Sequence, residues 1–249
     1  MRALGVDAAG VGRSGDLRWA GVVVDDDGFV AAGVGSLAGL IEWADELDAS
    51  TRVGAIGVDI PIGHVDGPRR LADVETRRFV QPLGSTVFPA PPAAVLDAMA
   101  AAGATYSEVN ATLLADGVPK LSRQAWALVP RMIEARDLAR RDDRLHEVHP
   151  EASFREIKIQ SHPEADVDMV RIRRSKKTWN GLMERRHLLA GVGIFLPDDD
   201  PELDGVVSDD VVDAAAAAWS AQRVAAGTAV SMPAPPERSP DGRDVAVWR

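Results

Sequence analysis

The chain contains no cysteine among its 249 residues. Disulfide bonds, thiolate metal sites and a cysteine nucleophile are therefore excluded. Any metal site must be built from carboxylates or from the five histidines, and a donor set dominated by oxygen favours a hard cation.

The sequence also lacks a hydrophobic run of the roughly 18 residues that a membrane-spanning helix needs. Its longest apolar stretches, such as Ala214–Trp219, are short and rich in alanine. Asp7 stands where a signal peptide would have the middle of its apolar segment. Hydrophobic residues nevertheless make up 46% of the chain, which is enough to bury a core. We expect a folded cytoplasmic protein with no membrane association.

Positively charged residues are fewer than negatively charged ones, and the formal net charge is −10. This balance argues against indiscriminate binding to nucleic acid. The charge is uneven, however, since residues 120–186 hold 16 Lys and Arg against 11 Asp and Glu. That segment is either a solvated, arginine-rich face of helices or a surface that meets phosphates. Only one Tyr, five Phe and six Trp are present, which weakens the case for stacking on single strands.

The order of the predicted elements indicates an α/β fold. Strands are expected at residues 3–7, 19–24 and 29–34, with a hairpin at Asp27-Gly28. A helix capped by Ser36 leads to a fourth, buried strand at 53–60. Helical segments punctuated by prolines follow over about 66–144, and a fifth strand is expected at 145–149. Further helices occupy a polar excursion over about 152–207 and residues 209–223, and an irregular surface tail is expected from 232 to 243.

With a right-handed crossover after the third strand, this order predicts a ribonuclease-H-like mixed five-stranded sheet. The strand order is 3-2-1-4-5, an antiparallel meander joined to parallel strands, with the helical insertion between strands 4 and 5. We expect one such domain over residues 1–249. A flavodoxin-like or Rossmann sheet is disfavoured because it would need helices between the first three strands.

The tripeptide Gly-Val-Asp ends two of the predicted strands, at Asp7 and at Asp59. Residues two apart in a strand share a face, so each aspartate points to the same side as the glycine before it. We expect the missing side chains of Gly5 and Gly57 to leave room for an ion. If the two strands are adjacent and parallel, the two carboxylates emerge side by side and would repel or share a proton unless a cation binds between them.

Further acids begin the last long helix, at Asp209, Asp210 and Asp213. Capping by Ser208 or Asp209, with acids in the first turn, explains Asp209 and Asp210 well. It explains Asp213 poorly, because this residue lies one turn further along and directly precedes the small residues that must face the sheet. The carboxylates of Asp7, Asp59, Asp210 and Asp213 therefore form the expected ligand set for Mg²⁺ or Mn²⁺.

Three motifs together resemble the DUF429 family: Asp59-Ile60-Pro61-Ile62-Gly63, the run from Glu147 to Phe154, and Asp210-Val211-Val212-Asp213-Ala214. The resemblance extends from Gly5 to the region of Gly227, and the His-Pro-Glu run at 149–151 is its most specific part. The family is described as predicted nucleases of ribonuclease-H-like fold, so the resemblance implies that fold and a nuclease activity. The two acids three apart on the last helix are also similar to those of RuvC-type resolvases, which favours Asp210 and Asp213 over Asp209 as the metal pair.

Other polar residues are candidates for supporting roles. Glu151 is either a further ligand or base for water, or a residue of a helix cap, and His149 is either a proton shuttle or a hydrogen-bonded core residue. Gln124 lies near the start of a long helix, where contact with substrate is an option. The cations expected around phosphates, each of which could equally belong to a charged solvent face, come from Arg69, Arg70, Arg77, Arg78, Lys176, Lys177 and Arg185.

Four acids in this arrangement predict a phosphodiester hydrolase in which two metal ions support in-line attack by water. The substrate would be nucleic acid or a nucleotide, and the acidic net charge favours a small or structured one. Two alternatives remain, a nucleotide phosphotransferase of the actin and sugar-kinase type and a non-catalytic adaptor. The first would usually need two such domains, and the second would predict the loss of some acids. The oligomeric state is left open, a homodimer included.

Overall fold

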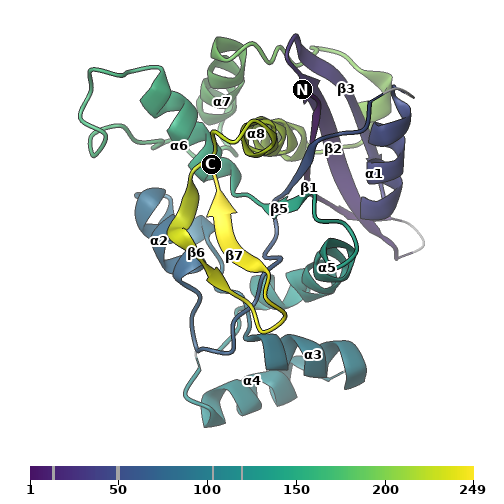
Figure 1. The fold of residues 1–249 in the computed structure, drawn as a ribbon, viewed down its shortest axis with the longest axis vertical. Coiled ribbons are helices and arrows are strands. Elements are labelled where there is room, and N and C mark those ends of the chain that lie inside the picture. The colour runs from purple at the N-terminus through teal and green to yellow at the C-terminus, as the bar shows by residue number, and fades with distance from the viewer. Residues whose placement is uncertain (13–14, 49–50, 103, 119) are drawn as a thin grey trace.

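The computed structural model describes residues 1–12, 15–48, 51–102, 104–118 and 120–249. Five strands form a mixed sheet in the order β3-β2-β1-β4-β5 (Figure 1). They are β1 (Ala3–Val11), β2 (Leu17–Asp25), β3 (Gly28–Gly35), β4 (Ala55–Val58) and β5 (Leu145–Glu147). The first three pair antiparallel, while β1, β4 and β5 run parallel. The predicted ribonuclease-H-like arrangement is confirmed.

Local sequence signals explain the first half of the sheet. The tight connection between β2 and β3 pairs Asp25 with Gly28, as the Asp27-Gly28 step predicts. The side chain of Ser36 accepts a hydrogen bond from the Gly39 amide and so caps α1 (Leu37–Glu46). This helix carries the chain back to β4, which lies beside β1.

The helical insertion lies between β4 and β5, as expected. It contains α2 (Leu71–Phe79), the short 3₁₀ helix η1 (Gly84–Thr86), α3 (Ala93–Ala102), α4 (Tyr106–Ala115) and α5 (Arg123–Ala139). After β5 come α6 (Pro150–Gln160), α7 (Trp179–Gly191), η2 (Pro201–Leu203) and α8 (Ser208–Ala225). Within the described ranges, no helix is both long and apolar enough to cross a membrane.

Helices cover both faces of the sheet, with α8 on one side and α1 on the other (Figure 1). Leu4 and Val6 point towards the core that includes α1 and α5. Ala3 belongs to the opposite core, with α8 and with residues of α6 and α7. This alternation along β1 is the period of two that a strand imposes. It places Gly5 and Asp7 on the same side as α8.

The small residues of α8 let this helix lie against the sheet at very short range. A Cβ atom on Gly5 would lie 2.1 Å from the Ala214 carbonyl oxygen and 2.1 Å from the Ala218 nitrogen. A Cβ atom on Gly57 would lie 2.4 Å from the Ala217 carbonyl oxygen. The expectation that these glycines leave room for an ion is therefore wrong, because the α8 backbone fills that space. These two glycines affect the site indirectly. Because they have no side chains, α8 lies close to β1 and β4 where Asp7 and Asp59 are found.

The C-terminal segment differs from the predicted irregular tail. It forms an antiparallel hairpin of β6 (Ser231–Arg238) and β7 (Asp244–Trp248), which packs on α2. The pairing is interrupted between Met232 and Glu237, and all three prolines of β6 fall within this gap. Proline lacks the amide hydrogen that a ladder requires, so the break accommodates a proline-rich sequence in a strand. The composition concealed the hairpin for this reason.

Candidate metal-binding active site

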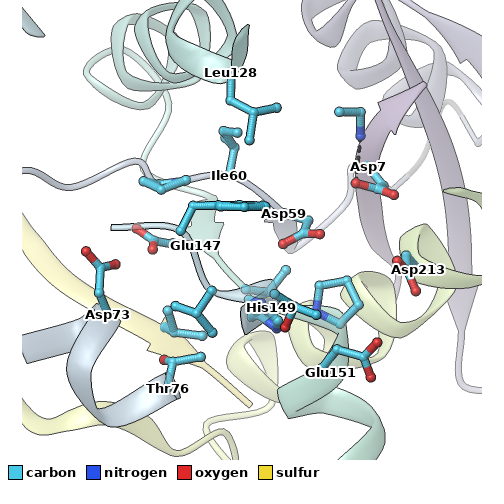
Figure 2. A pocket seen from close by; sticks show the side chains of 18 of the residues that line it. Asp7, Asp59, Ile60, Asp73, Thr76, Leu128, Glu147, His149, Glu151 and Asp213 are labelled. Atoms are coloured by element: carbon cyan, nitrogen blue, oxygen red, sulfur yellow. Dashed lines mark hydrogen bonds between the residues drawn. The ribbon is translucent and has the colours of Figure 1, made fainter. Parts of the chain in front are cut away.

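Three carboxylates from distant parts of the chain meet where β4 ends beside the middle of β1, because β1 continues past Asp7 to Val11 instead of ending there as predicted. In the parallel pairing, Gly5 lies opposite Gly57 and Val6 opposite Val58, so Asp59, directly after β4, lies beside Asp7 of β1. Asp213 faces them from α8. Ligand oxygens of these three residues all lie within 4.8 Å of one another (Figure 2). Asp7 and Asp213 are buried and Asp59 is half-buried. Such a group of carboxylates can hold a metal ion.

Burial, together with neighbouring negative charges, makes the three carboxylates difficult to ionise. Burial, reinforced by the charges of Asp59 and Asp213, raises the pKa of Asp7 well above its ordinary value. Burial raises the pKa of Asp59 to about 7, although Lys176 and a hydrogen bond from Asp7 act in the opposite direction. Burial likewise raises the pKa of Asp213 to about 7, against the effect of Lys176. A positive charge close to these carboxylates therefore stabilises their ionised forms.

Lys176 supplies part of that charge. Its ammonium group donates a hydrogen bond to Oδ2 of Asp213 and lies 3.7 Å from Oδ2 of Asp209. Although burial lowers the pKa of Lys176, the nearby carboxylates of Asp213 and Asp7 raise it overall, so the side chain stays protonated. Oδ1 of Asp213 is buried and has no hydrogen-bond partner among the described residues. One ammonium group thus leaves an acceptor of the site unsatisfied.

The other acids of α8 lie beside this group of three. Asp210 is half-buried, and burial together with the charge of Asp209 raises its pKa. It is outside the set of carboxylates that lie within 4.8 Å of one another. Asp209 accepts a hydrogen bond of 2.6 Å from Lys177. The helix begins at Ser208 after Val207, and no side chain caps it, so the capping explanation for Ser208 and Asp209 is wrong.

Glu151 enters the site from the first turn of α6 (Figure 2). Both of its carboxylate oxygens accept hydrogen bonds of 2.7 Å from the Arg185 guanidinium. Arg185 has an exposed fraction of 0% and also donates to the carbonyl oxygens of Gly181 and Arg174. The predicted phosphate contact is thus replaced by a positioning role, in which Arg185 links α6 and α7 to the loop that carries Lys176.

His149 precedes α6 and lines the same cavity. Burial lowers its pKa, so the imidazole is neutral at pH 7. Nδ1 is buried, and it has no hydrogen-bond partner in the part of the chain that the structure describes. The Pro150 ring takes the first helical position, as is common for proline, and fixes the direction in which α6 leaves β5.

A second buried charge network stabilises the segment that follows Asp59. Arg70, with an exposed fraction of 2%, donates to Oε2 of Glu147 at 2.8 Å and to Oδ1 of Asp73 at 3.1 Å. It also donates to the Gly63 carbonyl oxygen at 2.6 Å, while Glu147 accepts from the Ile62 amide at 2.9 Å. Arg70 therefore lines the cavity with its charge already matched by two carboxylates.

The remaining predicted contacts are exposed and lie outside the cavity lining. Arg78 is on the solvent side of α2, and Gln124 is in the first turn of α5, where Ser122 provides the cap. Lys177 is 67% exposed and pairs with Asp209. Asp7, Asp59, His149, Glu151 and Asp213 are thus brought together, and the outer cations are dispersed.

Sequence patterns gave no indication of three residues that line the cavity, namely Asp73, Thr76 and Phe88. Asp73 accepts hydrogen bonds from the Ala90 amide, 17 residues further along the chain, and from Arg70, three residues before it. No fixed spacing links these residues to the Gly-Val-Asp motifs. The arginine at the start of α2 was the only available signal, because a buried arginine requires carboxylate partners.

The fold and the site together define an α/β protein of ribonuclease-H-like arrangement with a buried three-carboxylate centre. The sequence profile of the family described as "Protein of unknown function (DUF429)" matches residues 5–238. The chain belongs to the DUF429 family. No curated protein and no solved structure matches the chain.

Proposed function

We propose that this protein is a metal-dependent phosphodiester hydrolase that acts on nucleic acid or nucleotides. The observation that carries the proposal is the convergence of Asp7, Asp59 and Asp213, whose ligand oxygens lie within 4.8 Å of one another. Three closely spaced carboxylates, two of them buried and one half-buried, are destabilising unless protons or cations neutralise them. A structural role alone does not explain why three carboxylates lie so close together.

The donor set fits Mg²⁺ or Mn²⁺. All three groups offer hard oxygen atoms, and the unpartnered Oδ1 of Asp213 provides a free acceptor. Lys176 offsets one negative charge, and a divalent cation would offset the other two. Asp210 lies close enough to affect the pKa of Asp7 and is available as an outer acceptor.

When bound, the metal ion would supply Lewis-acid activation of water and charge stabilisation at the phosphoryl group. Lys176 is placed to bind a phosphoryl oxygen beside Asp213. The water oxygen forms a new bond to phosphorus, and the bond from phosphorus to the leaving oxygen breaks. Neutral His149 accepts the proton that the water releases and passes it to the departing oxygen, so the site is left in its original protonation state. Arg185 keeps Glu151 oriented towards this reaction space.

The test is cleavage of RNA, DNA, branched junctions and nucleotides in the presence of Mg²⁺ or Mn²⁺. Asp7→Asn, Asp59→Asn and Asp213→Asn should each abolish a metal-dependent cleavage that the wild-type protein performs. Asp116→Asn, at the exposed end of α4, is the matched control and should retain full activity. Equal turnover by the wild-type and the three site variants would show that the activity belongs to a contaminant.

A further inference from the structure

The three carboxylates form one wall of a cavity that is lined further along by apolar side chains. Its volume is about 290 Å³, at the lower end of the range of roughly 300–1,000 Å³ that is typical of small-molecule sites. In Figure 2, Asp7 and Asp213 lie at one side and Asp73 and Thr76 at the other. Apolar side chains from four segments line the space between, among them Ile60, Val87, Phe88, Leu128, Met132 and Val247.

The charge of this lining is unfavourable for the interior of a nucleic-acid strand. Six carboxylates line the cavity, together with only two strong cations, Arg70 and Lys176. Both cations already bind carboxylates, at Glu147 and Asp213 respectively. A strand is held mainly by several lysine and arginine contacts to successive phosphates. Among the lining residues that the structure describes, none offers an unpaired lysine or arginine for a second phosphate.

Besides Oδ1 of Asp213, two buried polar atoms of residues at the cavity have no hydrogen-bond partner among the described residues. Thr76 has an exposed fraction of 0%, and neither its Oγ1 nor Nδ1 of His149 makes a hydrogen bond with the described residues. Buried polar atoms are almost always hydrogen-bonded, and each exception requires an explanation. Both residues line the cavity, so a bound molecule with a polar edge would satisfy them. An apolar space with polar atoms at its edge is complementary to a planar heterocycle.

We infer that the cavity binds one nucleobase of the substrate while its phosphate lies at the carboxylates. The substrate is then a single nucleotide ester or the terminal nucleotide of a strand, and not the interior of a duplex. Phe88 provides an aromatic surface for the base, and Thr76 a hydrogen bond to its edge. This inference rests on the proposed hydrolase function only for the position of the phosphate.

Calorimetric binding with Mg²⁺ tests the base site without requiring turnover. Nucleoside 5′-monophosphates are compared with ribose 5-phosphate, which carries the same phosphate and sugar but no base. Because stacking of one base on an aromatic side chain is worth about tenfold or more in affinity, we expect at least that preference for a nucleotide. Equal affinity of ribose 5-phosphate and all nucleotides, or no binding of either, would overturn the inference.

Thr76→Val provides a sharper variant, because it preserves the shape of the side chain and removes only the unpartnered hydroxyl. We expect nucleotide affinity to fall about two- to tenfold, with unchanged affinity for ribose 5-phosphate and no loss of stability. Thr112→Val, on the exposed face of α4, is the matched control and should bind like the wild-type protein. Leu128→Trp, which fills the cavity from α5, should abolish the preference for a base. Unchanged nucleotide affinity in both cavity variants would refute the base site.

Circular and linear single strands separate this inference from the proposed function. We expect stepwise removal of terminal nucleotides from the linear strand and no cleavage of the circular one. If the circular strand is cut and Asp213→Asn abolishes that cleavage, the hydrolase proposal stands and the base-site inference fails. If no strand is cut but Thr76→Val selectively weakens nucleotide binding, the base site stands and the hydrolase proposal fails.

Discussion

Replacing Asp213 by Asn should stabilise the metal-free protein at pH 8. The residue is 1% exposed on α8, and its carboxylate shares a small volume with those of Asp7 and Asp59. Asparagine has nearly the same shape as the protonated carboxyl group but never ionises. The variant therefore isolates the free energy of holding a third negative charge at this position.

The magnitude follows from the pKa of Asp213, which burial raises from 3.8 to about 7 in the folded protein. The folded state therefore binds a proton that the unfolded chain has already released between pH 4 and pH 7. Stability is greatest below this window and falls as pH rises through it. Each tenfold difference in proton affinity is worth about 1.4 kcal/mol, so the full loss is about 4 kcal/mol. We expect Asp213→Asn to exceed the wild type by about 4 kcal/mol at pH 8 and by only about 1.5 kcal/mol at pH 5.

Urea denaturation in a chelator at pH 5, 6, 7 and 8 measures this difference. Asp116→Asn, at the exposed end of α4, serves as the control for the substitution itself. Saturation with Mg²⁺ or Mn²⁺ should narrow the difference at pH 8, because an ion at 100 times its dissociation constant stabilises the wild type by about 2.7 kcal/mol. An Asp213→Asn variant that is less stable than the wild type at both pH 5 and pH 8 in chelator would refute the reasoning.

Three further predictions concern residues that position the site or offset its negative charge. Gly5→Ala should destabilise the protein by about 3 kcal/mol or more in urea, because its Cβ would overlap the α8 backbone, whereas Gly191→Ala, with open space around it, should be neutral; equal effects would contradict the close approach of α8. Arg70→Met should cost about 3–5 kcal/mol by leaving Glu147 and Asp73 buried without this cation, and adding Glu147→Gln should recover part of that loss in a double-mutant cycle. Lys176→Met should lower stability in chelator by about 1.5–3 kcal/mol and enlarge the rise in melting temperature on adding Mn²⁺, since the ion then replaces the lost positive charge; a smaller metal effect than in the wild type would argue against a shared site.

Much of the fold could be predicted because its signals are local. The alternation of β1, the Asp-Gly turn between β2 and β3, and the Ser36 cap each involve residues within a few positions of one another. Repetition of Gly-Val-Asp also predicted that Asp7 and Asp59 would lie side by side, since parallel strands end at one edge of a sheet. The β6–β7 hairpin was missed because its prolines fall in an interruption of the pairing that the composition does not reveal.

The acidic residues of the candidate site could be predicted from the sequence, but the arginines that pair with its glutamates could not. Whether Asp210 or Asp213 faces Asp7 depends on the rotation of α8, which is set by how closely Gly5 and Gly57 allow its backbone to approach. The pairing of Arg185 with Glu151 spans 34 residues, and that of Arg70 with Glu147 spans 77. Such pairs depend on burial, which forces each arginine to find a carboxylate within reach.

The sequence by itself determined which groups could carry the chemistry, because the absence of cysteine leaves carboxylates and histidines as the possible ligands and Gly-Val-Asp occurs in two of the predicted strands. The tertiary structure decided which of those groups meet and which cations remain available for a substrate. That division has a physical basis: strand and turn preferences act over a few bonds, whereas desolvation and charge pairing depend on distances that only the folded chain defines.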